Sequence, residues 1–104
     1  MVLEDIVCIV TGAGSGIGRA TALSMSNQGA KVVLVGRTLA KLSAVAQEIE
    51  SSGGVARTHS LDVSDRDAVF FMANEVAEWF GRIDVLVNGA GHNSARRRLL
   101  NITP

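Results

Sequence analysis

The sequence predicts an α/β fold in which a doubly wound parallel sheet carries helices on both faces. Short runs rich in β-branched residues alternate along the chain with longer segments whose apolar residues recur at helical spacing, and glycines separate the two kinds of segment. The strand-like runs are apolar on both faces, which is typical of strands buried inside a parallel sheet. Right-handed crossovers between four such strands predict the strand order 3-2-1-4.

The first strand is expected at residues 6–11 (IVCIVT), a run that ends at a cluster of glycines. Residues 18–28 are rich in Ala and Ser and predict a helix, which Gly29 should end. A second β-branched run at residues 31–35 (KVVLV) predicts the next strand. These segments form the first strand–helix–strand unit of the predicted fold.

The second helix is expected to begin at Leu39, with Thr38 as its N-cap. Three apolar side chains then recur at helical spacing, and these are Leu42, Val45 and Ile49. Gly53 and Gly54 should end this helix. The segment is therefore expected to pack one apolar face against the sheet.

The second half of the chain predicts one more strand–helix unit and a last strand. Residues 55–63 (VARTHSLDV) read as a strand of mixed polarity, and residues 64–67 resemble a capping box at the start of a helix. Four apolar residues share one face of that helix, namely Val69, Ala73, Val76 and Phe80. Gly81 should end the helix, and residues 83–88 (IDVLVN) predict the fourth strand.

The composition excludes several classes of function. The 104 residues include ten basic and ten acidic side chains, so bulk charge gives no reason to expect a nucleic-acid or membrane partner. No apolar run is long enough to span a bilayer, and the N-terminus has no signal-peptide pattern. The single cysteine, Cys8, suits a reducing compartment, and we expect a cytoplasmic protein. Neither His59 nor His92 has partners at metal-ligand spacing, so no metal site is expected.

The glycine-rich segment TGAGSGIG, residues 11–18, stands between the first strand and the first helix. Glycines at such a junction permit positive φ angles and let a diphosphate approach the backbone closely. The helix N-terminus adds free N–H groups and the positive end of its dipole. Gly12, Gly16 and Gly18 fit the spacing G-x-x-x-G-x-G. The segment therefore predicts a phosphate-binding turn.

Other interpretations of this segment are weaker. It is not a P-loop, because no Lys-Ser or Lys-Thr follows the glycines. The literal G-x-G-x-G of Gly12, Gly14 and Gly16 resembles the first motif of many methyl-transfer enzymes, but those normally place an acid after the second strand and this chain has none there. A tight turn without a ligand would not need four glycines in eight residues.

Three motifs together resemble the short-chain dehydrogenase/reductase family, whose cofactor domain has a Rossmann-type fold. They follow the first, third and fourth strands and read Thr11-Gly12-x-x-x-Gly16-Ile17-Gly18, Asp62-Val63 and Asn88-Gly89-Ala90-Gly91. One departure is visible, because the family's Asn-Asn-Ala-Gly has Gly89 as its second residue here. The resemblance covers nearly the whole chain and implies an oxidoreductase that transfers hydride between NAD(P)(H) and a small carbonyl or alcohol substrate.

The resemblance also implies roles for individual residues. The cofactor diphosphate would lie on the glycine turn, whose implied contact residues are Gly12, Ser15, Gly16, Ile17 and Gly18. Asp62 would accept a hydrogen bond from the adenine amino group, and Val63 would pack near the adenine ring. The cofactor cleft would be lined by Asn88, Ala90 and Gly91. A solvated carboxylate and a plain flexible turn remain the alternatives for Asp62 and for the last motif.

Arg37 predicts which dinucleotide binds. It stands just after the second strand, where an acid would otherwise bond the ribose hydroxyls of NAD. An Arg can instead make charge-assisted bonds to the 2′-phosphate of NADP, and Thr38 and Ser15 could add hydroxyl donors. We therefore expect NADP as the preferred cofactor, with NAD possible. The alternative is a surface Arg without a ligand.

The catalytic half of the family's chemistry is not expected in these residues. The family uses a Tyr, a Lys four residues later and a Ser, and this sequence contains no tyrosine. Thr103-Pro104 is typical of a helix start. We therefore expect residues 1–104 to be the N-terminal part of a single NAD(P)-binding domain, homo-oligomeric in full-length form. A non-catalytic dinucleotide-binding module, an inactive fragment and a methyl-transfer domain remain alternatives.

Overall fold

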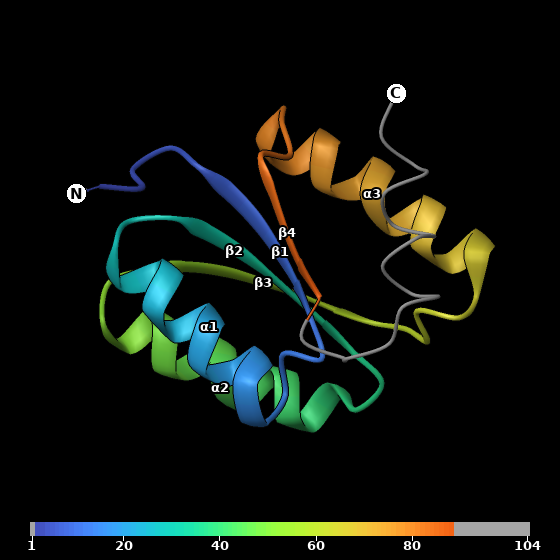
Figure 1. The fold of residues 1–104 in the computed structure, drawn as a ribbon, viewed down its shortest axis with the longest axis horizontal. Coiled ribbons are helices and arrows are strands. Elements are labelled where there is room, and N and C mark those ends of the chain that lie inside the picture. Colours follow the sequence, from blue (N-terminus) through green and yellow to red (C-terminus); the bar gives the residue numbers. More distant parts are fainter. Residues whose placement is uncertain (1, 89–104) are drawn as a thin grey trace.

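The computed structural model describes residues 2–88 as alternating strands and helices (Figure 1). The strands are β1 (Val7–Thr11), β2 (Lys31–Gly36), β3 (Val55–Ser60) and β4 (Val85–Asn88). The helices are α1 (Gly16–Asn27), α2 (Leu39–Ser51) and α3 (Arg66–Phe80). All strand pairs are parallel and the sheet has the order β3-β2-β1-β4, which confirms the predicted fold class and strand order.

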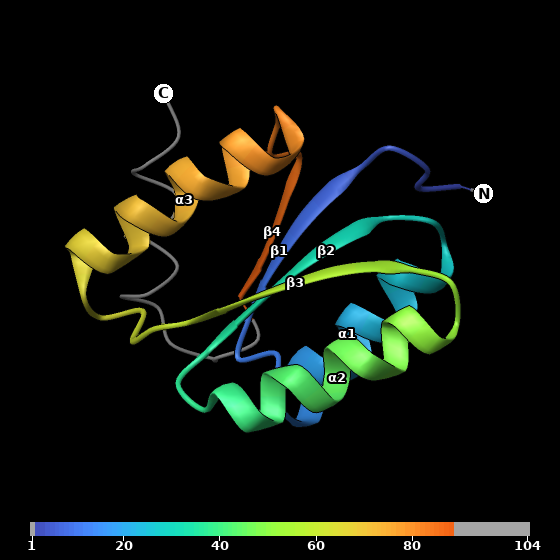
Figure 2. The ribbon, with the colours of Figure 1, turned by 180° about the vertical axis from the view of Figure 1, so that it is seen from behind.

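The helices cover both faces of the sheet. Helices α1 and α2 lie side by side on one face and α3 lies on the other, as the two opposite views agree (Figure 2). The strand residues alternate between two buried clusters for this reason: Cys8 and Val10 pack toward α1 and α2, whereas Val7 and Ile9 pack toward α3. Strand β1 is therefore buried at every position and β2 at its four middle positions, because each face meets a helix.

The boundaries differ slightly from the prediction. Helix α1 begins at Gly16, two residues before the expected start, so its first turn includes part of the glycine segment. Strand β3 ends at Ser60 rather than at residue 63, because only residues 55–60 pair with β2. Asp62 therefore lies in the loop between β3 and α3 and not within a strand.

The N-cap position was predicted correctly for α2 and one residue too early for α3. Thr38 is the N-cap residue of α2, but its side chain makes no capping hydrogen bond. Helix α3 is capped by Asp65 and not by Ser64, since Asp65 Oδ1 accepts from the Ala68 amide at 3.2 Å. Gly81 ends α3 in the left-handed conformation, with φ of 76°, as expected.

Strand β4 is joined to β1 by side chains at both ends of the pair. At the amino end, Asp84 Oδ2 accepts from the Val7 amide at 2.8 Å, and Asp84 Oδ1 accepts two bonds from Arg82 at 2.7 and 3.0 Å. At the carboxyl end, Thr11 Oγ1 donates to Asn88 Oδ1 at 3.0 Å. No helix within residues 2–88 has the length and apolar character needed to cross a membrane.

Candidate functional site

The carboxyl ends of all four strands meet at one edge of the sheet. In the pairing register, Thr11 lies opposite both Val35 and Asn88, and Gly36 lies opposite Ser60. The loops that leave β1, β2 and β3 therefore begin at the same edge. Open α/β sheets bind ligands at this edge, next to the point where the strand order reverses. Here the order reverses at β1, because β2 and β3 lie on one side of it and β4 lies on the other.

The turn after β1 depends on glycine geometry. Gly12 and Gly16 have φ angles of 61° and 58°, in the left-handed region that favours glycine. Gly18 has an ordinary φ, but a Cβ there would collide with the backbone carbonyl group of Gly12. Helix α1 thus packs directly on the turn that precedes it. A side chain at position 18 would push the two apart.

The N-terminus of α1 is open to an anion. Ser15 is the N-cap residue with extended backbone, and its side chain makes no capping hydrogen bond. The amides of a helix's first turn have no acceptor inside the helix, and the dipole adds partial positive charge there. No acidic residue occupies the first turn of α1, and Ile17 is 78% exposed beside it. A Cβ on Gly16 would meet no atom within 4 Å. These features fit a diphosphate.

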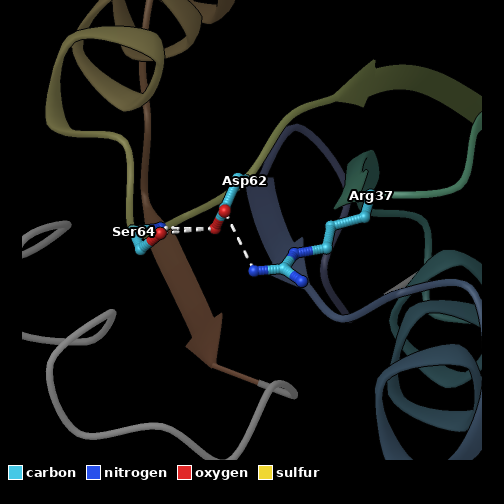
Figure 3. A network of polar contacts seen from close by, with 3 residues as sticks. All are labelled: Arg37, Asp62 and Ser64. Atoms are coloured by element: carbon cyan, nitrogen blue, oxygen red, sulfur yellow. Dashed lines mark hydrogen bonds and ion pairs between the residues drawn. The ribbon is translucent and has the colours of Figure 1, made fainter.

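A network of polar contacts links three residues in the loops that follow β2 and β3 (Figure 3). Arg37 Nη2 donates to Asp62 Oδ2 at 2.9 Å, which joins the end of β2 to the loop after β3. The other carboxylate oxygen, Asp62 Oδ1, accepts from the Ser64 amide at 2.9 Å and from the Ser64 hydroxyl at 2.7 Å. The Ser64 bonds, followed by the Arg37 bond, lower the pKa of Asp62 to about 2. Asp62 is therefore an anion at neutral pH.

The structure places the remaining predicted residues around this network. Ser60 Oγ donates to the Arg37 carbonyl at 3.1 Å, so the main chain of Arg37 is held while its side chain is 74% exposed. Thr38 is exposed and follows Arg37 directly. Val63 is partly buried and packs on the apolar cluster beneath α3. Val63 therefore stands where the loop leaves the core, next to Asp62.

The last predicted motif is only partly described. Asn88 is the final residue of β4 and accepts the hydroxyl of Thr11, which is completely buried. Ala90 and Gly91 lie outside the described residues, as does Gly89. The structure thus brings the glycine turn, Arg37, Asp62 and Asn88 to one edge.

Sequence reasoning missed two parts of this site. It assigned Arg37 and Asp62 to different parts of a ligand and did not expect them to contact each other. It also treated Ser64 only as part of a capping box. The spacing Asp62-x-Ser64 did carry a usable signal, because Asp side chains often accept hydrogen bonds from groups two residues ahead.

The other features that could indicate a functional site lie outside the candidate site. The part of the chain that the structure describes has no group of three or more His, Cys, Asp or Glu able to hold a metal ion. Burial raises the pKa of the Cys8 thiol to about 11, so it is not a nucleophile at neutral pH. A pocket of about 380 Å³ lies beside β3, and no residue of the candidate site lines it. Its walls are formed by Ser43, Ala46, Gln47, Glu50, Ala56, Arg57, Thr58 and Trp79.

Comparison with known proteins identifies the relatives of this chain. The family model described as short chain dehydrogenase matches residues 6–102. An uncharacterized oxidoreductase of Staphylococcus saprophyticus is 44% identical over 90 residues, which cover 86% of this chain and 38% of that protein. The chain thus spans less than half the length of this curated relative.

Two solved structures resemble the fold equally well. A metagenomic short-chain oxidoreductase in complex with NADP has a TM-score of 0.92 and 36% identity, with 98% of this chain and 56% of that chain covered. An NAD⁺-bound xylitol dehydrogenase also has a TM-score of 0.92, with 27% identity and coverage of 98% of this chain and 48% of that chain. The two neighbours bind different dinucleotides, so the likeness indicates a dinucleotide cofactor without choosing between them.

Proposed function

This chain belongs to the short-chain dehydrogenase family, and from that premise we propose that it is the cofactor-binding part of an NADP-preferring oxidoreductase. Residues 1–104 would form the N-terminal part of a single NAD(P)-binding domain. Bound NADP(H) supplies or accepts the hydride that converts a carbonyl to an alcohol or the reverse. The residues described above hold and orient that cofactor.

The diphosphate is assigned to the glycine turn. The close packing of Gly18 on Gly12, the open N-terminus of α1 and the free space over Gly16 support this placement. Ser15 and Ile17 border the same turn and are exposed. Here the backbone, rather than any charged side chain, would neutralise the diphosphate.

The adenosine end is assigned to the loops after β2 and β3. Asp62 is an anion that can accept from the adenine amino group, and Val63 lies beside it. Asn88 would line the cleft from β4, together with Ala90 and Gly91. A ligand bound in this way would lie along the carboxyl edge of the sheet.

The preference for NADP depends on one observation, the exposed Arg37 at the end of β2 with no acid at that strand end. Four of the five N–H donors of a guanidinium remain after one donates to Asp62, and a phosphate can accept two of them side by side. NAD carries no phosphate at this position. Thr38 adds a hydroxyl within the same loop.

A fluorescence titration of the chain with NADPH and with NADH tests the proposal. We expect NADPH to bind at least about fivefold more tightly, because one charge-assisted contact contributes about 1 kcal/mol or more. Absence of binding by both dinucleotides contradicts the proposed function. Equal affinities leave dinucleotide binding in place and contradict the preference for NADP.

A further inference from the structure

The two oxygens of the Asp62 carboxylate have different kinds of partner. Oδ1 is held by two bonds from Ser64, the amide at 2.9 Å and the hydroxyl at 2.7 Å. Oδ2 is held by one bond from Arg37 at 2.9 Å. Figure 3 shows Ser64 and Arg37 approaching the carboxylate from opposite sides. One side of the carboxylate is thus fixed by its own loop and the other by a long side chain from another strand.

These partners differ in how easily they can leave. The side chains of Arg37 and Asp62 are 74% and 44% exposed, and ion pairs in such surroundings contribute little to stability. A phosphate would offer Arg37 a stronger, two-point contact. Ser64 is only two residues from Asp62 and one of its two donors is a main-chain amide, so it stays in place. When Arg37 turns to a phosphate, Oδ2 is vacated and Oδ1 remains held.

We propose that Ser64 is a positioning residue of the cofactor site, which fixes the Asp62 carboxylate through Oδ1 so that Oδ2 can exchange Arg37 for the amino group of adenine. This inference rests on the proposed function and adds a residue to it. Arg37 and Asp62 would each trade their mutual contact for a contact with the same ligand. Ser64 keeps the carboxylate oriented throughout that exchange.

The Ser64 hydroxyl has no other evident structural task. Helix α3 is capped by Asp65, whose Oδ1 accepts from the Ala68 amide, so the helix start does not need Ser64. The Ser64 side chain is exposed and belongs to neither buried cluster. Removing its hydroxyl should therefore leave the fold intact and leave Oδ1 of Asp62 held by the Ser64 amide alone, so the carboxylate is less firmly oriented and ligand binding carries an ordering cost.

The test measures NADPH binding by the native chain and by three variants. Ser64→Ala removes the hydroxyl, Ser64→Thr restores one, and Ser24→Ala is a matched control on the exposed side of α1. We expect Ser64→Ala to weaken NADPH binding by about three- to tenfold, the size of one hydrogen bond of ordinary strength, because the Ser64 amide still holds Oδ1. Ser64→Thr should stay within about twofold of the native chain, and Ser24→Ala should not differ from it.

A second ligand separates positioning from a general structural effect. In the hypoxanthine analogue of NADPH a carbonyl oxygen replaces the adenine amino group and the hydrogen sits on ring N1, so the exocyclic position no longer offers Asp62 a donor. Ser64→Ala should bind this analogue as well as the native chain does. In the same variant, carbon-detected NMR should show the pKa of Asp62 rising from about 2 toward its ordinary value, because one of its two strongest donors is gone.

Each other outcome overturns the inference. Unchanged NADPH affinity in Ser64→Ala means that the hydroxyl does not position Asp62 for the ligand. Equal losses for NADPH and the hypoxanthine analogue mean a structural effect without relation to the amino group. If the native chain binds no dinucleotide, the proposed function itself is wrong and this inference is wrong with it.

Discussion

Two Asp–Arg pairs lie at the amino and carboxyl ends of the strands of the same sheet, and they differ in the partners and in the exposure of the Asp side chain. At the amino edge, Asp84 accepts two bonds from Arg82 on one oxygen and the Val7 amide on the other, with its side chain 19% exposed. At the carboxyl edge, Asp62 receives a single bond from Arg37 and its side chain is 44% exposed. The Arg82–Asp84 pair lies within the loop before β4, which Asp84 also ties to β1 through the Val7 amide, whereas the Arg37–Asp62 pair joins two loops.

The difference separates a carboxylate that satisfies a buried amide from one whose partners are all exposed. Asp84 satisfies a backbone amide of the buried residue Val7, so its loss would leave that amide without its partner. Asp62 satisfies only groups that water can reach. The same residue types therefore stabilise the sheet at one edge and remain exchangeable at the other.

The largest effect is expected from removing each carboxylate in turn. Asp84→Ala should lower the melting temperature by roughly 5 °C or more, because the Val7 amide loses its acceptor in a poorly solvated position. Asp62→Ala should stay within about 2 °C of the native chain. Thermal unfolding followed by circular dichroism measures both. Equal losses would mean that Asp62 is also structural.

The next effect concerns cofactor choice. Arg37→Asp should weaken NADPH binding at least about fivefold, or ~1 kcal/mol, because a phosphate then meets two carboxylates instead of a guanidinium. NADH binding should be spared. Arg82→Asp is the matched control at the amino edge and should not alter the ratio of the two affinities. Similar losses for NADPH and NADH in Arg37→Asp would contradict the role of Arg37.

Low pH should reduce the contribution of both Asp–Arg pairs to the stability of the fold. Because the folded-state pKa values of Asp62 and Asp84 are lowered, their stabilising contributions are present above the ordinary Asp value of about 4 and are lost as pH falls through the lowered values, which for Asp62 is about 2. Urea unfolding at pH 7 and at pH 3 should show this loss. The double variant Asp62→Asn, Asp84→Asn should lose less stability between these pH values. If the double variant loses as much stability between pH 7 and pH 3 as the native chain does, the lowered pKa values are contradicted.

The smallest effect is expected from salt. Raising the ionic strength from about 0.05 to 0.3 M should weaken NADPH binding about twofold, because the Debye length shrinks and the Arg37 side chain is exposed. NADH binding should change little, because NADH has no phosphate to contact Arg37. The melting temperature should also change little, because the Arg82–Asp84 contact is shorter than the Arg37–Asp62 contact and the Asp84 side chain is less exposed. Parallel titrations at the two salt concentrations measure this difference. A salt response of the same size for NADH would remove Arg37 as its cause.

Much of the fold could be predicted because burial leaves a clear pattern. Strands β1 and β2 are covered on both faces and each contains four consecutive apolar residues, and glycines with positive φ mark several turns. Strand β3 is an outermost strand of the sheet and includes the polar residues Arg57 and His59, so its end was predicted three residues too late. The motifs of the candidate site could be placed relative to the sheet because they follow the ends of the strands.

The contacts within the site were harder to predict. The Arg37–Asp62 bond depends on the rotamers of two exposed side chains, which a sequence pattern does not encode. The capping box was predicted to begin at Ser64 and the N-cap is Asp65, because both residue types suit an N-cap and only the backbone geometry decides between them. Local sequence thus predicted where polar groups lie but not which of them pair.

The pairing of β4 with β1 has a consequence for the order in which the protein assembles. Strands β1, β2 and β3 pair with their neighbours along the chain, whereas the Thr11–Asn88 bond joins residues 77 positions apart. Contacts of such long range form late, because a long loop must close first. On the ribosome, the first three strands can associate while the fourth is still being synthesised. The edge that would hold the cofactor is then completed last, after the sheet that supports it.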